Sequence, residues 1–265
     1  MERTIALWVA YDGTEFHGWQ NQPELRTVQS VLEQALRRVV RHQVDLLGSG
    51  RTDTGVHAAG HVSSFRTTCD LDVERFRHAV GSRLPKDVSI IGVRHVHSDF
   101  HATRSAISKL YRYRIHNAPG RPVESATHGH TYHFWESLDV ERMREGARHF
   151  IGEKDFAAMA GKGGNVRETT VRTVLRCGVE RHRDEIRIDV EGTGFLYKQV
   201  RTMVGTLINV GRGQWAPQRV AEVLAGAERS DAGPTVPARG LCLRWVKYPA
   251  RLLRANGELR IANYE

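Results

Sequence analysis

The stretch VLRCGVERHRDEIRIDVEG (residues 174–192) decides the fold class. It holds two strand-like runs, 174–182 and 185–192, separated only by Arg183 and Asp184. Two such runs joined by a two-residue turn are typical of a β-hairpin, and a hairpin makes antiparallel sheet. Further apolar or alternating runs predict strands at 4–11, 44–50, 61–67, 88–96, 109–117, 127–135 and 241–248.

Helices are predicted singly between these strands, at 27–42, 72–84, 138–152, 195–213 and 217–229. The first has its apolar residues on one helical stripe and begins at Thr27, a good N-cap residue. Hairpins and single helices, without regular βαβ alternation, favour an α+β fold. We therefore expect a mixed, largely antiparallel sheet flanked by helices.

Two segments resemble each other: LDVERFRHAV (71–80) and LDVERMREGA (138–147). Together with the order of elements, this similarity suggests two pseudo-repeated halves with a cleft between them. Chance similarity is the alternative, because helices often begin with acidic residues. We place the N-terminal half at 1–105, the C-terminal half at 106–249 and a polar tail at 250–265.

The composition is that of a basic globular protein: 39 Lys and Arg against 30 Asp and Glu, a net charge of +9, in 265 residues. Basic and aromatic residues interleave in KLYRYRI (109–115), which favours nucleic acid as a partner, although basic residues can also simply solubilise a surface. No apolar run approaches the ~18 residues of a membrane span. The N-terminal residues do not match a secretion signal, and the three cysteines form no CxxC pair, so we expect a cytoplasmic location and no disulfide framework.

The stretch GSGRTDTGVHAAGHV (48–62) places one acid, Asp53, among glycines, an arginine and two histidines. Asp53 could cap a turn, ligate a metal together with His57 and His61, or be the reactive group of an enzyme. Gly55 and Gly60 weigh against a helical metal site, because each costs a helix ~1 kcal/mol relative to alanine. The sequence has no P-loop, no GxGxxG followed by the right helix and no GxSxG elbow.

Two other segments favour the reactive interpretation. In the helix predicted at 195–213, Lys198, Arg201, Thr202 and Gly205 fall opposite the apolar stripe. Small residues on that face would let a substrate approach if it lined a cleft, and Arg201 would then face an anion. In the strand 109–114, Tyr111 lies on one side as an aromatic platform, although an ordinary half-buried strand residue is the alternative.

Together the segments GSGRTDTGVHAAGHV, KLYRYRI and GTGFLYKQVRTMVGTLINVGRGQ (192–214) resemble the signature motifs of the tRNA pseudouridine synthase A family. Further similarities are YDGTEFHGWQNQP (11–23), VQSVLEQAL (28–36), FHA (100–102), IGEKDF (151–156) and PARGLCLRWVKYP (237–249). The resemblance covers roughly residues 3–249, and the tail from Ala250 lies beyond the family's usual end.

The resemblance implies the pseudouridine synthase fold, with two pseudo-repeated halves around a basic cleft, and a homodimer. It implies conversion of uridine to pseudouridine at positions 38, 39 and 40 in the anticodon stem-loop of tRNA, with no metal and no organic cofactor. By position in the motifs, Asp53 matches the catalytic aspartate and Tyr111 the tyrosine that stacks on the target base. Arg201 matches the arginine that pairs with the aspartate, and Arg51 the arginine that holds the base out of the stack.

One motif departs from the family pattern, which usually reads FHAR: here FHATRSA (100–106) has Thr103 at the basic position and Arg104 one residue later. Adjacent strand residues face opposite sides, so we assign Arg104 no role in the site.

The chemistry requires an ionised carboxylate. Burial opposes ionisation, whereas a nearby guanidinium favours it by ~1–3 pKa units. Two other functions stay open: an RNA-binding module without activity, and a metal-dependent hydrolase built on His57 and His61.

Overall fold

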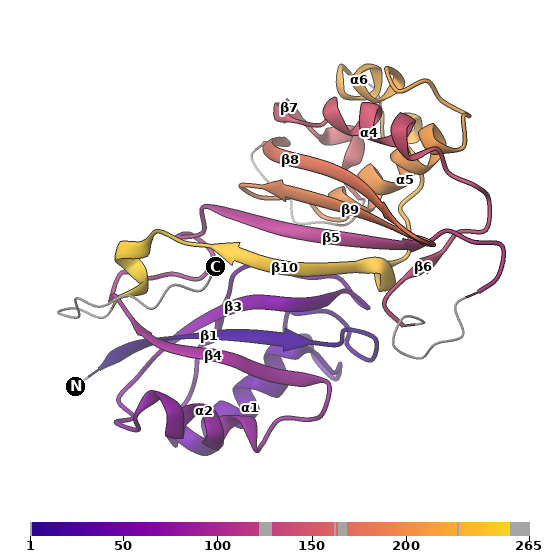
Figure 1. The fold of residues 1–265 in the computed structure, drawn as a ribbon. Helices are drawn as coiled ribbons and strands as arrows, with labels where there is room; N and C mark the ends of the chain where they lie inside the picture. Colours follow the sequence, from indigo (N-terminus) through magenta and orange to yellow (C-terminus); the bar gives the residue numbers. More distant parts are fainter. Residues whose placement is uncertain (1, 122–128, 162, 164–168, 227, 255–265) are drawn as a thin grey trace. The chain divides into compact units, whose positions relative to one another are not determined.

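The computed structural model describes residues 2–121, 129–161, 163, 169–226 and 228–254. The chain forms two compact units (Figure 1). Unit 1 comprises residues 1–107 and 245–265, and unit 2 comprises residues 108–244. The domain boundaries predicted at 105 and 249 stay a prediction.

The sheet of unit 1 is antiparallel. Its central strand β1 (Arg3–Tyr11) pairs on one side with β3 (His57–Thr67) and on the other with β4 (Val88–Val96). The short β2 (Leu47–Gly48) pairs with β3 just before the glycine-rich loop. The register sets several apolar residues beside one another, with Ile5 opposite Phe65 of β3 and Leu7 opposite Val93 of β4.

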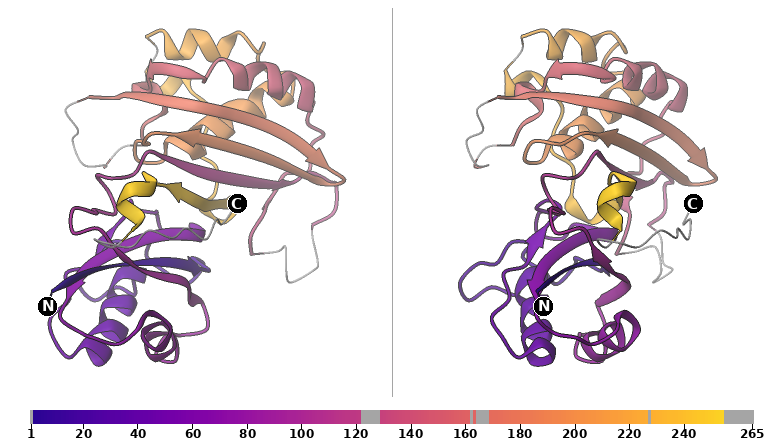
Figure 2. Two further views of the ribbon diagram at one scale, coloured as in Figure 1. Left: turned by 60° about the vertical axis from the view of Figure 1, so that its left-hand side comes forward. Right: turned by 90° about the vertical axis from the view of Figure 1, so that its left-hand side faces the viewer.

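Two helices, α1 (Val28–Val40) and α2 (Val73–Gly81), lie together on one face of this sheet (Figures 1 and 2). Thr27 caps α1, because its hydroxyl accepts the Ser30 N–H at 3.2 Å. The core between helices and sheet contains Ile5, Leu7, Val9, Leu32, Leu36, Phe65, Phe76 and Val80, all at most 2% exposed. Burial of these side chains holds unit 1 together, at about 1.5–3 kcal/mol each.

Within unit 2, antiparallel strands pair in the order β5-β9-β8-β7. These strands are β5 (Ser108–His116), β7 (Gly152–Asp155), β8 (Val171–His182) and β9 (Glu185–Gly192), and the short β6 (Tyr132–His133) lies parallel to β5. Arg183, with φ 54°, and Asp184 form the tight turn between β8 and β9, so the predicted hairpin is confirmed. β10 (Leu241–Lys247) leads the chain from unit 2 back to unit 1.

Helix α4 (Val140–Arg148) packs against β8 and against α5 (Gln199–Gly211), and α6 (Arg219–Leu224) follows. The two similar segments found in the sequence form the starts of α2 and α4. Each start has an aspartate N-cap, Asp72 or Asp139, whose carboxylate accepts the backbone N–H three residues later. That both segments are copies of one ancestral half stays a prediction.

The predicted fold class is confirmed: the described residues form helices and largely antiparallel sheet. Several predicted elements are shorter than expected, notably the strands at 44–50 and 127–135 and the helix at 217–229. Residues 127 and 128 of the second strand lie outside the described residues, and β7 was not predicted. Among the described residues, no helix has both the length and the apolar character needed to cross a bilayer.

The predicted cleft-lining face of α5 is wrong for Thr202 and Gly205. Both are buried, and they pack against residues 233–236 of the same unit. A Cβ added to Gly205 would lie 1.8 Å from the Pro234 carbonyl oxygen, so only glycine permits this backbone contact. The hydroxyl of the next residue, Thr206, accepts the Gly233 N–H at 3.0 Å. The small residues therefore admit another part of the chain rather than a substrate.

Gly205→Ala tests this packing. The added methyl group forces the helix and the Pro234 backbone apart, so we expect the free energy of unfolding to fall by about 2–3 kcal/mol. Gly178→Ala, in β8 of the same unit, is the matched control because a Cβ there meets no atom within 4 Å. Urea unfolding followed by circular dichroism compares the two. Equal stabilities would contradict the packing.

Candidate functional site

The loop that carries Asp53 joins β2 to β3 and ends in a tight turn. The Val56 N–H donates to the Asp53 carbonyl at 3.1 Å, and Gly55 between them has φ 76°, as the third residue of a type II turn requires. Arg51 is exposed and Asp53 is half-buried, while Thr52 between them is buried. The loop thus presents the arginine and leaves the carboxylate partly accessible.

Residues 11–20, after β1, hold this loop by backbone hydrogen bonds. The Trp19 N–H donates to the Thr52 carbonyl at 3.1 Å, and the Gly55 N–H donates to the Phe16 carbonyl at 3.3 Å. Gly18, with φ 85°, makes the first contact possible, since a Cβ there would lie 2.5 Å from the Thr52 oxygen. The conformation of the Asp53 loop is therefore set by a segment more than thirty residues earlier in the chain.

Side chains of residues 11–20 and of β3 add further bonds to the loop. The Tyr11 and Thr52 hydroxyls form a hydrogen bond at 2.8 Å, and the His61 imidazole Nε2 bonds the Gly50 carbonyl at 3.0 Å. The Arg51 guanidinium Nε–H donates to the Gln20 side chain at 3.0 Å. Each of the residues 50, 51 and 52 thus has a partner outside the loop.

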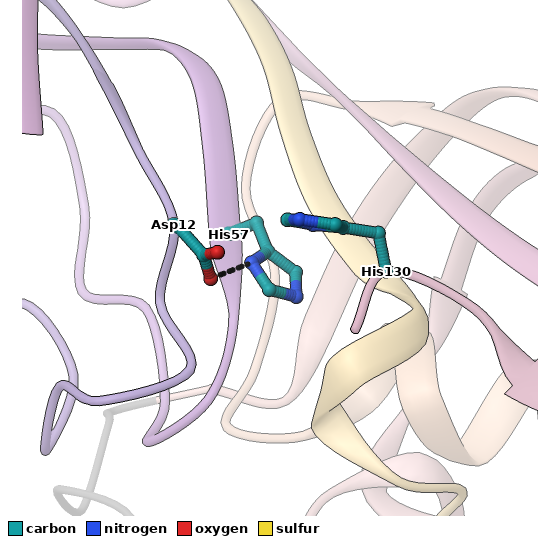
Figure 3. A group of neighbouring side chains, drawn as sticks. All are labelled: Asp12, His57 and His130. Atoms are coloured by element: carbon teal, nitrogen blue, oxygen red, sulfur yellow. Dashed lines mark ion pairs between the residues drawn. The ribbon is translucent and has the colours of Figure 1, made fainter. Parts of the chain in front are cut away.

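The two histidines after Asp53 have separate roles. His57, at the start of β3, accepts the Gly13 N–H on Nδ1 at 3.0 Å, and the Asp12 carboxylate lies 3.1 Å from the same atom (Figure 3). His130, also drawn in Figure 3, belongs to unit 2.

His61 instead stacks on Trp19, with ring centroids 3.7 Å apart. In the part of the chain that the structure describes, Asp53, His57 and His61 do not converge as a set of three metal ligands. The metal interpretation of this motif therefore has no geometric support in unit 1.

The altered FHATRSA motif also reaches this loop. The Thr103 hydroxyl donates to the Gly48 carbonyl at 2.6 Å, and the backbone N–H groups of Thr103 and Arg104 point to Nδ1 of His101. Burial lowers the pKa of His101, and the positive charge of Arg104 lowers it further. Thr103 thus anchors the start of the loop where the family's usual residue is basic.

The other two predicted site residues lie in unit 2. Tyr111, on β5, is 9% exposed, and its ring meets Phe195 edge-on at 5.4 Å. Arg201, on α5, is half-buried, and its Nε–H donates to the Val236 carbonyl at 2.7 Å. Arg51 and Asp53 therefore share one loop of unit 1, and Tyr111 and Arg201 share unit 2. The predicted pairing of Asp53 with Arg201 joins the two units and stays a prediction.

A second arginine of unit 2 was missed by the sequence analysis. Burial raises the pKa of the Tyr113 phenol well above its ordinary value, whereas the guanidinium groups of Arg201 and Arg239 lower it. The Tyr113 hydroxyl donates to the Pro237 carbonyl at 2.8 Å, two residues before Arg239. Two positive groups therefore act on the same neutral phenol. Arg239 lies in the segment PARG (237–240), part of a stretch that resembles a family motif.

Comparison with known proteins gives one consistent family. The family model described as tRNA pseudouridine synthase matches residues 7–103 and 147–249. These ranges contain Arg51, Asp53 and Arg201, while Tyr111 lies between them.

Curated relatives extend along nearly the whole chain. The tRNA pseudouridine synthase A 2 of Clostridium perfringens and the tRNA pseudouridine synthase A of Geotalea daltonii are each 42% identical to it over 246 residues. The tRNA pseudouridine synthase A of Pelobacter propionicus is 43% identical over 247 residues. Each match covers 93% of this chain and 100% of the relative.

Gly18→Ala tests whether residues 11–20 hold the Asp53 loop. A left-handed backbone at a residue with a Cβ costs of order 1–3 kcal/mol, so we expect amide exchange in residues 16–20 and 50–56 to accelerate by about tenfold or more. Hydrogen exchange followed by mass spectrometry measures it.

Gly81→Ala, in α2 of the same unit, is the control, because a Cβ there meets nothing within 4 Å. Unchanged exchange in the Gly18 variant would show that the loop holds its own conformation.

Proposed function

The chain belongs to the tRNA pseudouridine synthase family, and on that premise we propose that it isomerises uridine at positions 38, 39 and 40 of the tRNA anticodon stem-loop, with Asp53 as the catalytic carboxylate. One observation of the structure carries the assignment to Asp53. Its loop is fixed by hydrogen bonds from residues 11–20, and it leaves Asp53 half-buried beside the exposed Arg51. A loop that only connected two strands would need neither the fixed backbone nor the two charges.

The reaction is an isomerisation. The bond between N1 of uracil and C1′ of ribose breaks, the base turns, and a bond forms between C5 and C1′. C5 loses its proton and N1 gains one, so no group is imported and nothing is oxidised. A carboxylate can serve this sequence as a nucleophile at C1′ or as a base, and both roles require its ionised form.

The other predicted residues supply access and charge. Extruding the base costs a few kcal/mol, and stacking on Tyr111 at ~1–3 kcal/mol offsets part of it. Arg51 holds the extruded base out of the stack. The proposed mechanism pairs Arg201 with Asp53, and at ~4 Å such an attraction would amount to about 4 kcal/mol at an effective dielectric of ~20.

The partners follow from the charge and the family. A net charge of +9 suits a tRNA substrate, whose phosphates supply most of the affinity and little of the specificity. The family resemblance adds a homodimer, a cytoplasmic location and a reaction without metal or organic cofactor. These three statements are proposals that rest on the family.

Asp53→Asn tests the catalytic role. The amide keeps the shape of the side chain but can be neither nucleophile nor base, so we expect tritium release from tRNA labelled at C5 of uridine to fall at least about a thousandfold. Affinity for tRNA, measured by filter binding, stays within about threefold, because phosphate contacts dominate it.

Asp70→Asn, an exposed carboxylate of the same unit, is the control and retains normal release. Normal release by Asp53→Asn would refute the role. A wild-type protein that binds tRNA and leaves every uridine unchanged would instead establish the RNA-binding alternative.

Arg201→Gln tests the proposed pairing. Without the cation the carboxylate loses its proposed partner, so we expect kcat for tritium release to fall about tenfold or more while the affinity for tRNA stays within about threefold. Arg212→Gln, which loses an ion pair with Glu136 at the end of the same helix, is the control and keeps the wild-type kcat. An unchanged kcat in Arg201→Gln would exclude the pairing.

A further inference from the structure

Three aromatic side chains of unit 1 meet beneath the Asp53 loop. Tyr11, Trp19 and His61 are each at most 5% exposed. The His61 and Trp19 rings stack at 3.7 Å, and the Tyr11 ring lies 6.4 Å from Trp19 and 6.0 Å from His61. We name these three side chains the aromatic trio.

Each member of the aromatic trio makes one hydrogen bond to the loop. The His61 Nε2–H donates to the Gly50 carbonyl, the Trp19 backbone N–H donates to the Thr52 carbonyl, and the Tyr11 hydroxyl bonds the Thr52 hydroxyl. The carbonyl of Gly50 can only accept, so Nε2 of His61 carries a proton. The bonds reach the residues immediately before and after Arg51.

These bonds determine which way the loop side chains face. Gly50 and Thr52 are held toward the interior, so Arg51 between them is exposed and Asp53 follows half-buried. Trp19 packs closely against Gly48, because a Cβ added there would lie 2.4 Å from its Nε1. The contacts of the trio with the loop therefore end on the two residues that flank Arg51.

We propose that Tyr11 and His61 are positioning residues of the isomerisation, holding Arg51 and Asp53 in the geometry that the extruded uridine requires. The proposal rests on the proposed function of Asp53 and goes beyond it. A displacement of ~1 Å in a reacting group can cost about a hundredfold in rate. Loss of one contact of the trio should therefore lower kcat and leave the phosphate-dominated affinity for tRNA unchanged.

Tyr11→Phe, Thr52→Val and the double variant test the hydroxyl pair. Each single variant removes one side of the same bond, so we expect each to lower kcat about tenfold and the double variant to lower it no more than about twofold further. The tRNA dissociation constant stays within about twofold of wild type.

Thr67→Val is the matched control. It removes a buried hydroxyl bonded to His42, ten residues along β3 from His57, and should lower the thermal midpoint without changing kcat. Unchanged kcat in the two single variants, additive effects in the double variant, or an equal loss in Thr67→Val would each overturn the proposal.

His61 gives an independent test with a conservative rescue. His61→Gln places an amide donor near the position of Nε2, whereas His61→Leu has no donor for the Gly50 carbonyl. We expect a higher kcat in the variant that can still donate to the Gly50 carbonyl, with the Gln variant at least about tenfold faster than the Leu variant. Equal rates would overturn the role of His61. Wild-type protein in the same assay separates the two claims. A wild type that isomerises no uridine would refute the proposed function and this inference with it, whereas an active wild type with equally active variants would overturn this inference alone.

Discussion

The structure of the candidate site depends on one constraint: the backbone of residues 11–20 lies directly against the backbone of the Asp53 loop. The Trp19–Thr52 and Phe16–Gly55 hydrogen bonds require this approach, and Gly18 permits it. Gly13 does the same further along, since a Cβ there would lie 2.0 Å from the Val56 carbonyl oxygen. Side chains at these two positions would separate the segments and release the loop.

A loop fixed in this way has a thermodynamic consequence. Ordering a residue costs about 1–2 kcal/mol in backbone entropy, and here the cost is met during folding, when the core of unit 1 forms. The carboxylate and the guanidinium of the loop are therefore already placed before any RNA arrives. In the proposed reaction, binding energy from the tRNA phosphates would then serve to extrude the base rather than to order the loop.

The sequence predicts the local parts of this arrangement and misses the non-local ones. The hairpin around Arg183 and the Thr27 cap can be predicted from neighbouring residues. The choice of Asp53 as a candidate reactive residue likewise depends on the residues next to it. The bonds between residues 11–20 and the loop join residues 31 to 41 positions apart, which no periodicity in the sequence indicates. The prediction that Thr202 and Gly205 of α5 line a cleft was wrong for a related reason. Small residues indicate that another group approaches closely, but they do not tell whether that group is a substrate or the loop at Pro234.

In unit 2, the guanidinium of Arg201 is oriented in the same way as the charged residues of the Asp53 loop in unit 1. Gly205 admits the Pro234 backbone, and two residues later the Val236 carbonyl accepts the Nε–H of Arg201, which fixes the plane of the guanidinium. The neighbouring Tyr113 keeps its proton, because burial raises its pKa, so it adds no negative charge to compete for the cation. In both units a glycine lets a second loop approach, and that loop orients a charged side chain. This explains why glycines accompany the charged residues in both motifs. The orientation of each charged group is set by contacts with the second loop and not only by the torsion angles of its own side chain.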